Sequence, residues 1–142
     1  MKKIGEYTAK GQFTIPGSGG GEHMVNLFDG RFDTAYKVTK FEIITQDPIF
    51  NNVEFTAKLT TQPTTSRLFN WANNDQIAWA IGEDTFYVKD WVDPDNMVVE
   101  DLYVYAASGS EVTINYMITM EKYEISDWRG ALAMVRNSSQ AD

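Results

Sequence analysis

The chain has 142 residues, which is enough for one domain with a single hydrophobic core, and we expect that domain to span 1–142. It contains no cysteine and one histidine, which excludes disulfides, thiolate metal sites and two-histidine zinc motifs. The formal net charge is −8, so phosphate backbones and anionic lipid should repel the chain, and we expect neither a nucleic-acid nor a membrane partner.

Residues 1–21 are predicted to form an N-terminal strand or arm with a glycine-rich hinge. Glu6, Lys10 and Gln12 interrupt the apolar run that a signal peptide needs, so we expect no export by that route. The Gly-Ser-Gly-Gly-Gly run at 17–21 lacks the Gly-Lys-Ser/Thr ending of a phosphate-binding loop, which favours a flexible hinge. Such a hinge would let the preceding residues add a strand to the sheet of a neighbouring subunit.

Most of the remaining chain is rich in β-branched and aromatic residues between turn signals, which predicts about eight strands. An Asp-Gly dipeptide within 27–32 predicts a hairpin turn, and 34–45 follows as a long strand. Apolar and polar residues alternate over 53–60 and again over 112–121, which predicts two half-buried strands. The other predicted strands are 77–81, 86–92 and 97–106.

The hydrophobic period changes near the C-terminus, where 126–137 is predicted to form a short α-helix that ends near Arg136. One face of this helix carries Trp128, Leu132 and Val135. A polar tail follows at 138–142. The predicted fold is therefore an all-β, antiparallel β-sandwich or jelly roll of about eight strands with a C-terminal α-helix, and a closed barrel is the alternative.

Acidic residues suggest two kinds of site. One group surrounds a Pro-Asp turn and offers oxygen ligands of the kind that calcium prefers, but it lacks the spacing and the glycine of an EF-hand, so a solvated turn is expected. This group is Asp90, Asp93, Asp95, Asn96, Glu100 and Asp101. A glycosidase would need two carboxylates across a cleft, and nothing singles out one pair among 20 acids.

His23, the lone histidine, is expected to be a packed or surface residue, because a single histidine does not define a catalytic arrangement. Together with the acidic pattern, this leaves no residue to which chemistry can be assigned. We therefore expect no catalytic, cofactor-binding or metal-binding residues, no cofactor, and no enzyme.

Tyr103 and Tyr105 are the candidates for a partner interface on the sheet. If Val98, Leu102, Val104 and Ala106 face the core, both tyrosines point to the opposite side of their strand. There they would contact a partner, pack under a second layer of the same domain, or stack on sugar rings, and the sequence leaves these readings open. The helix residues Trp128, Leu132, Val135 and Arg136 cover the chain's own sheet or dock on a neighbour.

Three stretches of the sequence carry a family resemblance. They are NLFDGRFDTAYKV (26–38), DPDNMVVEDLYVY (93–105) and the segment 114–140, which includes INY, MEKY and DWRGALAMVRNSSQ. Together they resemble small, mostly uncharacterised virion-associated structural proteins of marine and freshwater tailed bacteriophages. The resemblance spans most of the chain, includes no catalytic motif, and implies a structural role in the particle.

From this resemblance we expect a bacteriophage virion structural protein, made in the host cytoplasm, that acts as a capsid decoration or cement protein. Its expected partners are the major capsid protein or other virion proteins, which it would bind as a homo-oligomer. The alternative is a tail- or fibre-associated receptor-binding protein with a carbohydrate-binding β-sandwich. That protein would stack sugars on Tyr103, Tyr105, Trp71 or Trp91.

Overall fold

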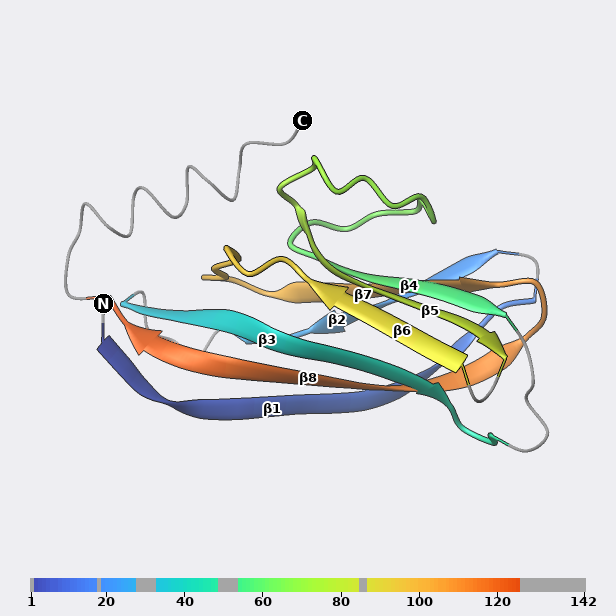
Figure 1. Ribbon diagram of the computed structural model, residues 1–142, viewed down its shortest axis with the longest axis horizontal. Helices are drawn as coiled ribbons and strands as arrows, with labels where there is room; N and C mark the ends of the chain where they lie inside the picture. Colours follow the sequence, from blue (N-terminus) through green and yellow to red (C-terminus); the bar gives the residue numbers. More distant parts are fainter. Residues whose placement is uncertain (1, 18, 28–32, 49–53, 85–86, 126–142) are drawn as a thin grey trace.

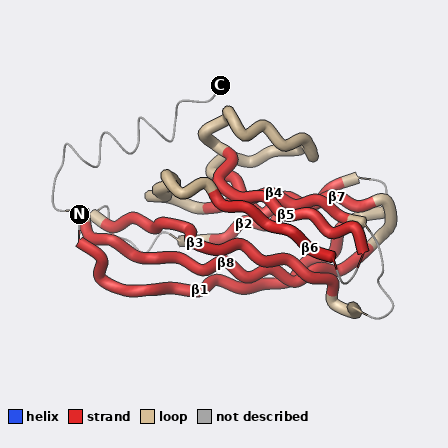
Figure 2. The backbone as a smooth tube through the Cα atoms, in the orientation of Figure 1, coloured by secondary structure: helices blue, strands red, loops and turns tan. Residues whose placement is uncertain are grey.

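The computed structural model of the chain describes residues 2–17, 19–27, 33–48, 54–84 and 87–125 (Figure 1). This part is all β, with eight strands in two antiparallel sheets that pack face to face (Figure 2). The strands are β1 (Lys2–Ile15), β2 (Gly20–Val25), β3 (Thr34–Thr45), β4 (Phe55–Thr60), β5 (Gln76–Asp84), β6 (Tyr87–Val92), β7 (Leu102–Ser108) and β8 (Val112–Glu124). The predictions of an all-β fold and of a sandwich of about eight strands are confirmed.

The strand order is β1-β8-β3 in the three-stranded sheet and β2-β7-β4-β5-β6 in the five-stranded sheet. Every ladder is antiparallel. Across the core, β3 also lies against β5 and β6 of the other sheet. β3 and β6 therefore belong to different sheets and meet by packing. β4 and β5, in contrast, are neighbours in the five-stranded sheet and pair by main-chain hydrogen bonds.

The predicted C-terminal elements lie outside the described residues. These are the helix at 126–137, with Trp128, Leu132, Val135 and Arg136, and the tail at 138–142. The Asp-Gly turn within 27–32 also lies outside them, except for Leu27, which is buried. All of these remain predictions.

The N-terminal segment is a strand of the chain's own sheet. β1 pairs with β8 from Lys2 to Ile15, with one irregularity between Lys3 and Gly5. Gly20 and Gly21, at the end of the predicted hinge, are the first residues of β2 and pair with β7. Only residues 16–19 therefore separate β1 of the three-stranded sheet from β2 of the five-stranded sheet.

The core is built from alternate residues of the central strands. In β8 the predicted alternation is confirmed: Ile114 and Ile118 are fully buried, whereas Met117 on the opposite face is 42% exposed. Phe41 and Leu59 bring equally buried side chains from the strands around it. Each such side chain contributes about 1.5–3 kcal/mol relative to exposure, so this apolar layer between the sheets is the main source of stability.

The predicted strand at 97–106 begins later than expected. Val98 forms an isolated bridge with Tyr36 of β3, and β7 starts at Leu102. Between them, the carboxylate of Asp101 accepts a hydrogen bond from the main-chain N–H of Leu27, 3.1 Å away. This stretch therefore crosses from the edge of one sheet to the other and cannot continue one ladder.

The acidic turn before Val98 has a structural role. The side chain of Asn96, 5% exposed, accepts a hydrogen bond from the N–H of Val38 (2.7 Å) and donates one to its carbonyl (2.8 Å). It also donates to the carbonyl of Asp93, whose carboxylate accepts from the N–H of Asp95. Asn96 thus takes the place of a partner strand at the edge of β3. Within the described ranges no group of three or more acidic or histidine residues could hold a metal ion.

Candidate functional site

A row of five side chains crosses the outer face of the five-stranded sheet. Antiparallel registers place Tyr105 of β7 between Glu22 of β2 and Lys58 of β4. The same row continues from Lys58 to Trp79 of β5 and then to Trp91 of β6. Each strand of this sheet therefore contributes one residue, because every second residue of a strand points to the same face.

Residues 61–75, which we name the strap, lie over the outer face of the five-stranded sheet (Figure 1). They contact this row through Glu22, Lys58 and Tyr105. The N–H of Thr61 donates to the carbonyl of Asp75 at 2.8 Å, which brings the two ends of the strap together. Because this loop is longer than most connections in compact domains, it needs its own contacts to hold a fixed position. The residues of the row supply them.

The first contacts are made over β2 and β7. The carboxylate of Glu22 accepts a hydrogen bond from the N–H of Thr64 at 2.8 Å. The hydroxyl of Tyr105 donates to the carbonyl of Thr65 at 3.1 Å. A Cβ atom at Gly20 would overlap the Tyr105 ring, so only glycine at this position lets the ring lie flat on β2 under the strap.

The central contact is made by Lys58, whose side chain is 1% exposed. Its ammonium donates to the carbonyl of Leu68 at 2.9 Å and lies 5.9 Å from the centroid of the Tyr105 ring. No ion pair joins Lys58 to a carboxylate of the described residues. Burial therefore lowers the pKa of Lys58, because removing an unpaired ammonium from water disfavours its charged form.

The last polar contact is made by Gln76, at the start of β5. Its side-chain oxygen accepts hydrogen bonds from the N–H of Asn70 at 2.8 Å and from the indole Nε1–H of Trp79 at 3.0 Å. The same amide thus holds the strap and fixes the ring of Trp79, which is buried. A buried indole needs such a partner for its N–H group.

The strap also carries two large apolar side chains that remain exposed. Trp71 packs on Trp79, with ring centroids 5.2 Å apart and planes inclined by 31°, and it contacts Trp91 at 6.0 Å. Trp71 is nevertheless 61% exposed, and Leu68, whose carbonyl binds Lys58, is 63% exposed. We name Leu68 and Trp71 the platform. Both sit on main chain that the sheet below holds in place.

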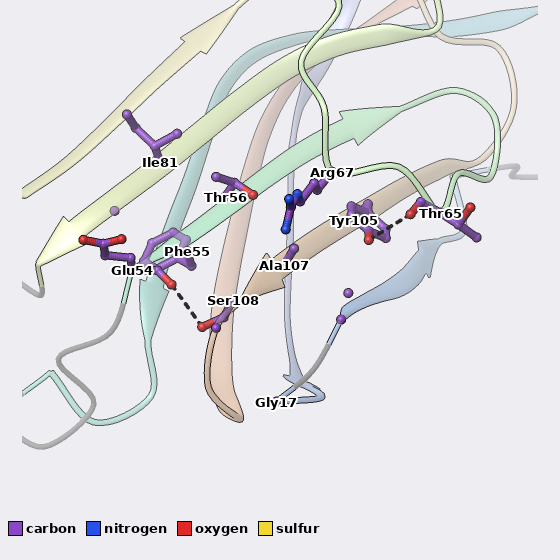
Figure 3. A pocket seen from close by; sticks show the side chains of 14 residues that line it. Gly17, Glu54, Phe55, Thr56, Thr65, Arg67, Ile81, Tyr105, Ala107 and Ser108 are labelled. Atoms are coloured by element: carbon purple, nitrogen blue, oxygen red, sulfur yellow. Dashed lines mark hydrogen bonds between the residues drawn. The ribbon is translucent and has the colours of Figure 1, made fainter.

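A hollow of about 880 Å³ lies beside the strap, at the end of the five-stranded sheet where β2 begins (Figure 3). Arg67 extends toward it from the strap, and Thr56 and Ala107 line its floor. Ser108 at its rim donates to the carbonyl of Glu54 at 3.0 Å. Among the lining residues, Arg67 and Glu54 are the charged ones and both are exposed, so the hollow does not hold two facing carboxylates.

The structure shows how Tyr103 and Tyr105, the candidate interface residues of the sheet, are placed. Leu102, Val104 and Ala106 face the core, so Tyr103 and Tyr105 lie on the outer face as predicted. Tyr105 is only 7% exposed because the strap covers it, whereas Tyr103 is half-buried. Tyr105 therefore packs under a second layer of its own domain and cannot contact a partner while the strap is in place.

Two other residues from the sequence analysis are also placed. His23 packs edge-on against the rings of Phe13 and Tyr116, each with centroids 5.6 Å away, which agrees with the expected packed histidine. Its Nδ1 atom has no hydrogen-bond partner among the described residues. Trp71 and Trp91, named as sugar-stacking candidates, are brought together in one cluster.

The roles of Lys58 and Gln76 were not predicted from the sequence. Alternation over 53–60 predicted that Lys58 and Thr60 would face solvent, and this is wrong: they are 1% and 2% exposed. The strap covers the polar side of β4, so that strand is buried on both faces. Two features of the sequence could have indicated this cover. One is the 15-residue connection that contains Leu68 and Trp71, and the other is a lysine in a strand whose neighbours are rich in aromatic residues.

Comparisons of the sequence with family models and with curated proteins found no match. The part of the chain that the structure describes contains no helix long and apolar enough to cross a membrane.

Proposed function

We propose that this chain is a virion structural protein of a tailed bacteriophage, and that it decorates the capsid by docking its platform on the shell. The observation that carries the proposal is the exposure of Leu68 and Trp71 on a segment that four strands hold by hydrogen bonds from below. Large apolar side chains on a pre-ordered main chain bind a protein partner without the entropic cost of ordering a loop.

The strand order supports a particular form of the sandwich, the jelly roll. A jelly roll arises when one long antiparallel hairpin folds over, so that strands pair as 1–8, 2–7, 3–6 and 4–5. Here β1–β8, β2–β7 and β4–β5 are hydrogen-bonded ladders, and β3 packs against β6 across the core. Jelly rolls occur in capsid and lectin domains, which fits both candidate functions, although a fold alone does not define a function.

The resemblance of 26–38, 93–105 and 114–140 to virion-associated phage proteins supports the location in the particle. The partner would be the major capsid protein or another virion protein, bound by copies of this chain as a homo-oligomer. The protein would be made in the host cytoplasm and would carry out no catalysis. The acidic charge of −8 is compatible with a protein surface as partner and not with packaged nucleic acid.

Quantitative mass spectrometry of purified particles from the encoding phage tests the location. Hundreds of copies per particle are expected for a decoration protein. A small multiple of three or six would instead place the chain in the tail, and its absence from particles would refute the proposal.

Rebinding to particles that lack the chain tests the platform. We expect Leu68→Ser and Trp71→Ser each to reduce binding at least tenfold, because central apolar residues dominate such interfaces. Asn74→Ser, on the same strap, is the matched control and should bind as the wild type does. If Leu68→Ser and Trp71→Ser both bind as tightly as the wild type and the control, the platform is excluded as the docking surface.

A second candidate function is carbohydrate binding by a tail or fibre component, favoured by the stacking of Trp71 on Trp79. A tryptophan that is held on one side and exposed on the other suits the apolar face of a sugar ring. The two functions differ in what they need from Leu68. Sugar stacking should survive Leu68→Ser and be lost with Trp71→Ser, whereas docking on a protein should need both residues.

A further inference from the structure

The outer edge of β1 is the longest open strand edge in the described part of the molecule. β1 has 14 residues and pairs with β8 on one side only (Figure 2). The opposite edge of the same sheet, β3, is met by Asn96 and Val98, which bond to its main chain. The unpaired N–H and C=O groups of an edge strand are a template for another strand.

The sequence of β1 is complementary to its own reverse. Gly5-Glu6-Tyr7-Thr8-Ala9-Lys10-Gly11 has a glycine at each end and Thr8 at its centre. About that centre, acidic Glu6 mirrors basic Lys10, and the large Tyr7 mirrors the small Ala9. In an antiparallel pair with a twofold axis at Thr8, each acidic side chain would therefore face a basic one and each large side chain a small one. The glycines at the two ends would face each other.

Other registers lose this match. A shift of the axis by one residue leaves Glu6 and Lys10 opposite uncharged residues. A shift by two residues sets Glu6 against Glu6 or Lys10 against Lys10, and like charges directly opposite are destabilising. The irregularity between Lys3 and Gly5 marks the point where a regular ladder would end.

We propose that β1 pairs with β1 of a second copy of this chain, antiparallel and centred on Thr8. The two three-stranded sheets then form one continuous six-stranded sheet, with Glu6 of each copy facing Lys10 of the other. Both side chains can make this pair: Lys10 is exposed, and the ion pair of Glu6 with Lys3, at 3.1 Å, is itself exposed. The dimer is independent of what the platform binds, because the strap lies on the other sheet.

A single cysteine at the axis tests the pairing directly. The chain has no cysteine, so Thr8→Cys provides one thiol, and directly opposed residues of an antiparallel pair lie within the Cα distance of a disulfide. Under mild oxidation we expect Thr8→Cys to form a covalent dimer at least tenfold faster than Ser110→Cys, an exposed turn control. Equal rates for the two variants would overturn the proposal.

Charge reversal tests the register of the β1 pair without an introduced cysteine. Glu6→Lys and Lys10→Glu each place like charges opposite one another twice per dimer, and we expect each to weaken dimerisation about tenfold by analytical ultracentrifugation. The double variant Glu6→Lys, Lys10→Glu should restore wild-type association. Circular dichroism checks that all three variants fold. A monomeric wild type at several hundred micromolar, or a double variant as weak as the single ones, would contradict the β1 pairing.

Discussion

The two edges of the three-stranded sheet are finished in opposite ways. At β3, the side chain of Asn96 bonds to both polar groups of Val38, so the edge is closed from within the chain. At β1, most residues are exposed and no described residue pairs with the outer side. The comparison shows that the molecule closes one edge with a turn and leaves the other edge unpaired among the described residues.

The two outer faces differ in the same way. The five-stranded sheet carries the strap, and polar residues at its centre, Lys58 and Thr60, are buried beneath it. The three-stranded sheet carries exposed side chains such as Thr8, Lys10 and Met117. Substitutions should therefore be costly on the covered side and inexpensive on the open side.

Asn96→Ala should have the largest effect. It removes both hydrogen bonds to Val38 and leaves a buried N–H and C=O without a partner, which costs roughly 2–4 kcal/mol. Chemical denaturation measures this loss of unfolding free energy. Asp95→Ala, in the same turn but exposed, is the control and should change stability by less than about 0.5 kcal/mol; an equal effect of both would mean that the closed edge contributes nothing.

Thr60→Val and Thr8→Val compare one substitution on the two sides. The hydroxyl of Thr60 donates to the carbonyl of Gln62 at 2.7 Å under the strap, so its loss should cost about 1 kcal/mol. Thr8 lies on the open side, and its replacement by an isosteric β-branched residue should stay within about 0.5 kcal/mol in the monomer. A larger loss at Thr8 would contradict the open edge.

Tyr105→Phe should loosen the strap more than it destabilises the fold. The change removes the hydrogen bond to Thr65 and keeps the ring, so about 1 kcal/mol or less is expected in global stability. Limited proteolysis within 61–75 should become faster. Tyr103→Phe is the matched control, and equal cleavage of the two variants would show that the hydroxyl of Tyr105 does not hold the strap.

Lys58 should give stability a pH dependence. Because burial lowers its folded-state pKa below 10.5, the unfolded chain binds more protons between the two values. The free energy of unfolding therefore rises with pH between the folded-state pKa and 10.5. It decreases again when the pH is lowered through this window to the folded-state pKa, because the folded protein must then bury a charged ammonium. Lys58→Met should remove the rise, which denaturation at several alkaline pH values measures as a difference from the wild type. Parallel pH profiles would contradict a buried, unpaired ammonium.

Local patterns were sufficient to predict the strands, because alternation and turn residues are short-range signals. The range 34–45 predicted β3 at its observed bounds, and the alternation over 112–121 predicted the core face of β8. The burial of Lys58 was not predictable in this way. It depends on the strap that crosses five strands, and the hydrogen bonds of Gln76 and Tyr105 to that strap join residues that no periodicity relates.

The same limit explains the edges. Asn96 was interpreted as a turn residue, which is correct, but its bonds to Val38 span 58 positions and only the fold reveals them. The symmetric pattern of β1 was visible in the sequence all along. Its significance depends on knowing that β1 is an edge strand, and strand order cannot be read from one strand.

Amide hydrogen exchange of the strap tests most directly whether it is a fixed layer that supports the platform. The N–H groups of Thr64 and Asn70 donate to Glu22 and Gln76, so they should exchange at least tenfold more slowly than unstructured amides, and Tyr105→Phe should speed exchange at Thr64 before it affects β8. Exchange of both amides at the rate of an unstructured chain, in a protein whose β8 amides are protected, would contradict the account.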